Sequence, residues 1–119
     1  SEKVTRIPSS TFANCYSLKN VEFSNSLTFV DYYAFQNCKS LTTITFPKTI
    51  SGIYDHNYSY ATFGGCTNLK TVNVRATAPF NIIPVLKNTN ATVYVPEVSL
   101  EAYQNYNGSD YKDRIKALK

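Results

Sequence analysis

The sequence predicts an α/β repeat solenoid with a narrow parallel sheet along one side and a helical carboxy-terminal cap. The first observation behind this prediction is the motif Phe-x-x-Cys-x-x-Leu-x-x-(Val/Ile)-x-(Phe/Val), which occupies residues 12–23, 35–46 and 63–74. The second is a short segment at the end of each copy in which apolar and polar residues alternate. The copies begin 23 and then 28 residues apart. Periods of this size indicate one supersecondary unit per repeat, stacked on the next.

An apolar pair precedes each copy of the motif. The pairs are Val4 and Ile7, Leu27 and Val30, and Ile50 and Ile53. The apolar positions stay in register on both sides of the longer second interval. Its five additional residues therefore lie between Ile53 and Phe63, where we expect a loop insertion.

The alternating segments are predicted to be β-strands with one buried face. They occupy residues 21–23, 44–46, 72–74 and 93–95. Stacked about 4.8 Å apart, one strand per repeat forms a narrow parallel sheet. The side chains predicted to point inward are Leu18, Val21, Phe23, Leu41, Ile44, Phe46, Leu69, Val72 and Val74. Those predicted to point outward, in two rows, are Asn20, Glu22, Thr43, Thr45, Thr71, Asn73, Thr92 and Tyr94.

The half-repeat before each strand is predicted to run back on the opposite side as a tight turn or a short helical segment. Its phenylalanines, Phe12, Phe35 and Phe63, should stack as an aromatic ladder. Burial of each ring contributes roughly 2–3 kcal/mol, so these rings are expected to be the main stabilising contacts.

The cysteines at positions 15, 38 and 66 share one place in the repeat, which favours buried structural thiols. A disulfide between adjacent coils and metal or redox chemistry remain as alternatives. The sequence has no Cys-x-x-Cys pair and a single histidine, so a zinc site lacks ligands. We therefore expect no metal and no cofactor.

Beyond Val74 the strand pattern returns at 93–95 without the Phe and Cys of the motif. Ser99 is predicted to be a helix N-cap, and residues 107–110 to break that helix before a second helical run over 111–118. The apolar faces of these helices are predicted to consist of Leu100, Tyr103, Tyr106 or Asn107, Tyr111, Ile115 and Leu118.

The domain prediction follows from these segments. Residues 1–75 are expected to form the repeats, the first of them partial, and residues 76–119 the last strand and the cap. A cap is needed because an open last coil exposes apolar side chains and a strand edge. The amino end has no such cover, so we expect a fragment of a longer array, with a self-sealing first coil as the alternative.

The composition argues against several classes of protein. The chain has 119 residues, 43% hydrophobic and 17% charged, as in one ordinary folded domain. It contains no apolar run long enough to span a bilayer and no recognisable signal peptide. The net charge of +4 comes from scattered lysines and arginines, so we expect no nucleic-acid partner. His56 beside Asp55 is too close in sequence for a catalytic dyad, and no nucleophile motif is near, so we expect no enzyme.

The motif, preceded by residues such as those from Ile7 to Ser10, resembles the BspA-type leucine-rich repeats of surface proteins from gut and oral bacteria and some protists. The resemblance covers residues 4–75, and residues 92–103 look like the closing segment of such arrays in Bacteroides-like bacteria. It implies a short right-handed leucine-rich-repeat coil, an extracellular or cell-surface location, and roles in adhesion. It supplies no catalytic residues.

Two places are candidates for ligand binding. On the sheet face, Glu22, Asn73 and Tyr94 are the most distinctive outward residues, although rows of Thr and Asn are also what a soluble sheet tolerates. The insertion has the composition of an adaptable binding loop, unless its rings fold back onto the solenoid. Its tyrosines are Tyr54, Tyr58 and Tyr60, with Asp55, His56 and Asn57 between them.

Together these features predict a monomeric, non-catalytic binding module without membrane insertion. Its ligand is expected to be a protein, as in adhesion to a host matrix, or a glycan. The alternative is a structural spacer or capping segment of a longer repeat array.

Overall fold

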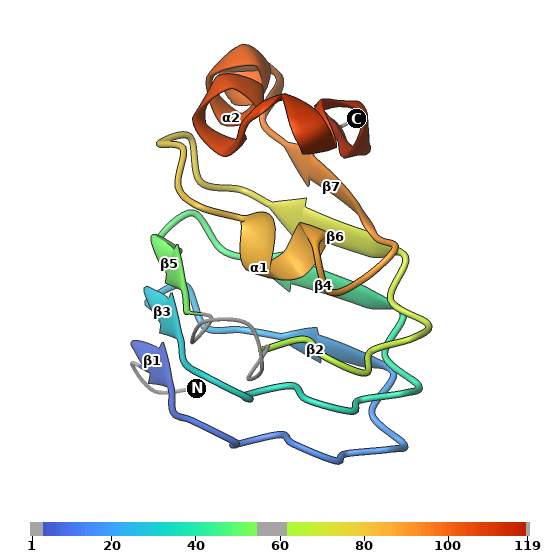
Figure 1. The fold of residues 1–119 in the computed structure, drawn as a ribbon. Coiled ribbons are helices and arrows are strands. Elements are labelled where there is room, and N and C mark those ends of the chain that lie inside the picture. Colours follow the sequence, from blue (N-terminus) through green and yellow to red (C-terminus); the bar gives the residue numbers. More distant parts are fainter. Residues whose placement is uncertain (1–3, 55–61, 119) are drawn as a thin grey trace.

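The computed structural model describes residues 4–54 and 62–118 of the chain, which form two parallel sheets and a small carboxy-terminal helical segment (Figure 1). The larger sheet has the strand order β2-β4-β6-β7-β8 and the smaller has the order β1-β3-β5. The strands are β1 (Arg6–Ile7), β2 (Asn20–Glu22), β3 (Phe29–Val30), β4 (Thr43–Phe46), β5 (Gly52–Ile53), β6 (Thr71–Val74), β7 (Thr92–Val95) and β8 (Ile115–Ala117). The helices are α1 (Ile83–Leu86) and α2 (Leu100–Asn107), with 3-10 turns η1 (Glu97–Ser99) and η2 (Ser109–Arg114).

The larger sheet confirms the strands predicted from the alternating segments. Its register pairs Val21 with Ile44 and Ile44 with Val72, and Val72 pairs with Val93 on β7. These residues point inward, and all but Val21 are buried. Successive side chains on a strand point to opposite faces. The residues before and after each inward residue therefore form the outward rows.

The smaller sheet was not predicted. Each of its strands contains the second residue of an apolar pair, and its register pairs Ile7 with Val30 and Val30 with Ile53 (Figure 1). Each strand is only two residues long, which is too short to show an alternating pattern in the sequence. The coils therefore carry a narrow parallel sheet on two sides rather than one.

The predicted aromatic ladder is confirmed. The ring of Phe35 is stacked between those of Phe12 and Phe63, at centroid distances of 5.2 and 5.3 Å. A second stack joins Phe23 to Phe46 at 5.4 Å, and its rings meet the first stack edge-on. Edge-to-face and offset-stacked pairs are the favoured arrangements of aromatic rings, so the two stacks reinforce each other in the interior.

The cysteine prediction is confirmed for two of the three thiols. Cys38 and Cys66 are buried, and each donates its S–H to the carbonyl of a phenylalanine in the preceding coil, Phe12 and Phe35, at 3.0 Å. Burial raises the pKa of both thiols, that of Cys66 to about 12. Cys15 is only half-buried, because the first coil packs against the second on one side only. All three are free thiols.

Tight turns follow each phenylalanine, as predicted. Asn14, Asn37 and Gly65 occupy equivalent positions and all have positive φ, which asparagine and glycine tolerate best. The Asn37 side chain donates a hydrogen bond to that of Asn14 at 3.0 Å. A Cβ atom on Gly65 would lie 2.1 Å from Asn37 Oδ1, so a larger residue there would displace the Asn37 side chain.

The carboxy-terminal segment differs from its prediction in three places. Ser99 precedes α2 but makes no capping hydrogen bond; its hydroxyl donates instead to the carbonyl of Thr77 at 2.6 Å. The predicted helix over 111–118 is wrong: η2 covers its start and β8 its end. Strand β8 pairs with β7 and places Ile115 opposite Val93, so pairing in the larger sheet overrides the helical spacing. The short helix α1 was not predicted.

Three side chains fasten this segment to the chain before it. The Tyr103 hydroxyl donates to the carbonyl of Ala76 at 2.7 Å, and burial raises the pKa of Tyr103 to about 12. The amide of Asn107 donates to Phe80 and Tyr103 and accepts from the N–H of Ile82. The Arg114 guanidinium donates to the carbonyls of Leu86, Thr89 and Ala91.

Candidate ligand-binding face

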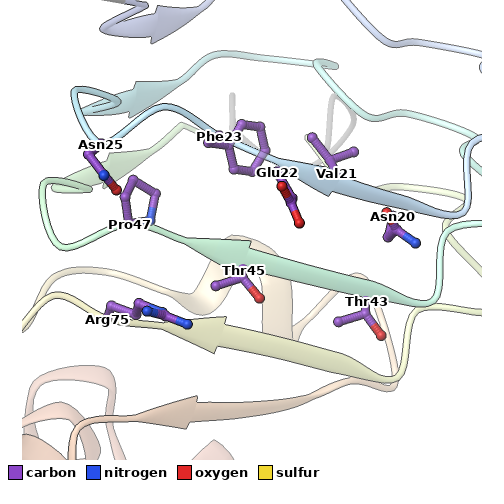
Figure 2. A pocket seen from close by; sticks show the side chains of 9 residues that line it. All are labelled: Asn20, Val21, Glu22, Phe23, Asn25, Thr43, Thr45, Pro47 and Arg75. Carbon is purple, nitrogen blue, oxygen red and sulfur yellow. The ribbon is translucent and has the colours of Figure 1, made fainter. Parts of the chain in front are cut away.

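The outward face of the larger sheet contains two adjoining depressions. The first has a volume of about 570 Å³ and lies over β2 and β4 (Figure 2). The second, of about 390 Å³, lies over β6 and β7. Arg75 lines both, so the depressions form one continuous shallow surface across the sheet. We call this surface the sheet face.

Two polar rows run across the sheet face in strand register. One consists of Asn20, Thr43, Thr71 and Thr92; the other consists of Glu22, Thr45, Asn73, Tyr94 and Lys116. The register follows from the inward residues between them, because a slip by one residue would expose every apolar side chain of a strand. The repeat that builds the core therefore also aligns the outward rows.

The predicted residues Glu22, Asn73 and Tyr94 lie in a single row, on three different strands. Asn73 donates a side-chain hydrogen bond to the Thr45 hydroxyl at 3.2 Å, which fixes the middle of the row. Tyr94 lies beyond Asn73 in the second depression. The structure thus brings together the three residues that the sequence singled out on this face.

Arg75 was missed by the sequence reasoning. It follows the last residue of β6, and its N–H donates to the carbonyl of Phe46, so the outward alternation continues through it. Its guanidinium lies in the first depression below Thr45, and the Glu22 carboxylate enters the same depression from β2 (Figure 2). Its place two residues after Asn73 was the signal that could have identified it.

Tyr54, the one described tyrosine of the insertion, lies elsewhere. It follows β5 of the smaller sheet and is 41% exposed. Its ring contacts Phe29 at a centroid distance of 4.9 Å and Tyr32 at 5.9 Å. Tyr58 and Tyr60, together with residues 55–57, lie outside the described residues. Tyr54 therefore belongs to a separate aromatic cluster and not to the sheet face.

An ion pair borders this aromatic cluster. The Arg6 guanidinium lies 2.6 Å from the Asp31 carboxylate and 5.9 Å from the centre of the Phe29 ring. Burial raises the pKa of Asp31, but hydrogen bonds from Arg6 and from the Tyr32 N–H, with the charge of Arg6, outweigh it and leave the pKa below its usual value. The opposite charges of Arg6 and Asp31 offset each other.

Within residues 4–54 and 62–118, no group of three or more His, Cys, Asp or Glu side chains is placed to hold a metal ion. In the same part of the chain, no helix has the length and apolar character required to cross a bilayer.

Comparison with known proteins identifies the repeats. The family model described as "BspA type Leucine rich repeat region (6 copies)" matches residues 1–85. Among curated proteins, no significant match to the sequence is found. The matched region includes β1 to β6 and continues into α1.

Proposed function

Because this chain belongs to the BspA-type leucine-rich-repeat family, we propose that it is a non-catalytic module that binds a protein ligand through the sheet face. The observation that carries this proposal is the continuous surface joined at Arg75, on which hydrogen-bonding, aromatic and charged side chains lie in strand register. Tyrosine and arginine are the side chains enriched at protein interfaces. A rigid sheet presents them at little cost in conformational entropy.

Membership of this family also supports a cellular location for the proposed function. Its repeats occur typically in bacterial surface or secreted proteins, so we propose an extracellular or cell-surface location and a role in adhesion. The ligand would then be a host-matrix protein. The chain acts as a monomer in this proposal, since one copy presents the complete sheet face.

We further propose that residues 76–119 act as a cap on the repeats of residues 1–75. Figure 1 places α2 at the end of the molecule beyond β7, which pairs with β6 of the last repeat. Within the segment, the side chains of Tyr103, Asn107 and Arg114 hold its helical part to residues 76–91. A segment fastened in this way would shield the apolar interior of the last coil.

The test is a binding array with immobilised host-matrix proteins and glycans. Tyr94→Ala and Asn73→Ala should each weaken binding to the captured protein by about 1–2 kcal/mol, roughly a tenfold increase in Kd. Tyr106→Ala is the matched control, because Tyr106 is a 60% exposed tyrosine on α2, away from the sheet face. If both sheet-face variants bind as the parent does, the ligand lies elsewhere.

The spacer alternative is favoured by one observation. Among the described residues, the three exposed tyrosines, Tyr16, Tyr54 and Tyr106, lie apart from one another, on the first coil, at the end of β5 and on α2. A spacer needs only scattered polar and aromatic groups of this kind. If the chain is a spacer, it should bind no protein or glycan of the array. Deletion of this segment from a longer protein should then leave the binding of that protein unchanged.

A further inference from the structure

We propose that the sheet face selects an extended peptide segment with a basic and an acidic side chain four residues apart. The basic side chain would pair with Glu22 and the acidic one with Arg75. This inference rests on the proposed function and adds to it the chemistry that the ligand must have.

The first step is that both charges are unpaired. Glu22 and Arg75 are exposed, and neither side chain has an ion-pair or hydrogen-bond partner in the part of the chain that the structure describes. Glu22 is also the one acidic residue in the outward rows of the larger sheet. Lys116, in line with Tyr94, adds a second positive charge on the side of the sheet nearer to β7. The sheet face is therefore negative at β2 and positive towards the other end.

The second step is the spacing of the two charges. Glu22 on β2 is in register with Asn73 on β6, two strands away, and Arg75 lies two residues beyond Asn73. Strands lie about 4.8 Å apart and rise about 3.3 Å per residue, so the two Cα atoms are roughly 12 Å apart. An extended chain covers this distance in about four residues. Side chains four residues apart also point to the same face of an extended chain.

The third step concerns the surface between the charges. Thr45 lies between Glu22 and Asn73 in the row, and its hydroxyl accepts a hydrogen bond from the Asn73 amide. These groups, with Thr43 and Asn20 beside them, offer donors and acceptors to the polar backbone of an extended segment. Figure 2 shows Asn20, Thr43 and Thr45 around the depression that holds the Glu22 carboxylate and the Arg75 guanidinium.

The charge pattern favours a peptide over a glycan. A ligand that satisfies both ends must carry a cation and an anion at a fixed separation. Polypeptides supply lysine or arginine together with aspartate or glutamate, whereas sialylated and sulfated glycans supply anions without cations and neutral glycans supply neither. Complementary charges of this kind contribute selectivity and faster association more than raw affinity.

The experiment uses the full chain and synthetic nine-residue peptides of Ser and Thr. The test peptide carries Lys at position 3 and Glu at position 7; the controls carry Lys and Lys, Glu and Glu, or Lys and Glu only three residues apart. Binding is measured by titration calorimetry and by chemical-shift changes of the sheet-face residues. We expect the test peptide to bind at least tenfold more tightly than each control, and to weaken in high salt.

The protein variants then reverse the charges. The Glu22→Lys variant should no longer bind the test peptide and should bind the Glu–Glu peptide instead. The Arg75→Glu variant should bind the Lys–Lys peptide. The double variant Glu22→Lys with Arg75→Glu should recover the test peptide, bound in the opposite direction. Glu101→Lys on α2 is the matched control, because it makes the same charge change at an exposed site away from the sheet face.

The outcomes separate this inference from the proposed function. Equal binding of all four peptides, no binding of any, or failure of the double variant to recover binding overturns the charge selection. A glycan that shifts the same residues while the peptides do not would also overturn it. If a matrix protein still depends on Tyr94 and Asn73 but is indifferent to the charge reversals, the sheet face remains the binding site and only the charge rule fails.

Discussion

Replacement of Phe35 by alanine tests whether the stacked rings are the main source of stability. The Phe35 side chain is fully buried, stacked on Phe12 and Phe63, and in edge contact with Phe23 at 6.0 Å. Transfer of a phenylalanine side chain from water is worth roughly 2–3 kcal/mol. The cavity that remains adds to this loss, and buried Phe→Ala changes cost about 3–5 kcal/mol.

A loss of this size is a large part of the 5–15 kcal/mol that stabilises a typical domain. We expect the midpoint of urea unfolding, followed by circular dichroism, to fall sharply, and the Tm to drop by roughly 10–20 °C. Phe12→Ala is the matched control. Phe12 is only half-buried and has a ring neighbour on one side, so its loss should cost about 1–2 kcal/mol. Equal effects at both positions, or a Phe35→Ala melt within two or three degrees of the parent, would show that the stack does not dominate stability.

Two further predictions follow from ionisable groups. Under native conditions Ellman's reagent should modify one thiol, Cys15, and in denaturant three, because burial raises the pKa of Cys38 and Cys66 and shields their sulfur atoms; rapid native labelling of Cys66 would contradict the buried stack. The pKa of Asp31 is lowered in the folded chain. Its ion pair with Arg6 therefore stabilises the fold fully above the ordinary carboxyl pKa of about 4, and this stabilisation is lost as the pH falls through the lower pKa of the folded state. Between pH 6 and pH 2, the urea midpoint of unfolding should therefore fall less for Asp31→Asn than for the unmodified protein. Equal decreases in the two proteins would exclude the ion pair as a contributor to stability.

The repeat motif by itself determined the main sheet. Alternation of apolar and polar residues is a local property of the chain, so it located strands β2, β4, β6 and β7 and divided their side chains into inward and outward sets. The fixed interval between copies also aligned Phe12, Phe35 and Phe63, because residues at equivalent places in stacked coils become neighbours. The row of Glu22, Asn73 and Tyr94 was predictable for the same reason.

Pairing between distant segments decided the rest. Residues 115–117 have helical spacing with Tyr111 and Leu118, yet they form a strand because β7 offers an unpaired edge beside them. Cys15 shares the repeat position of Cys38 and Cys66, yet it is only half-buried because it has a neighbouring coil on one side only. Arg75 lies on the sheet face, and Tyr54 packs on Phe29 beside the smaller sheet, because a residue's side of the solenoid depends on how the backbone continues beyond each strand. Local sequence encodes periodicity, but only the folded chain specifies which edges and faces meet.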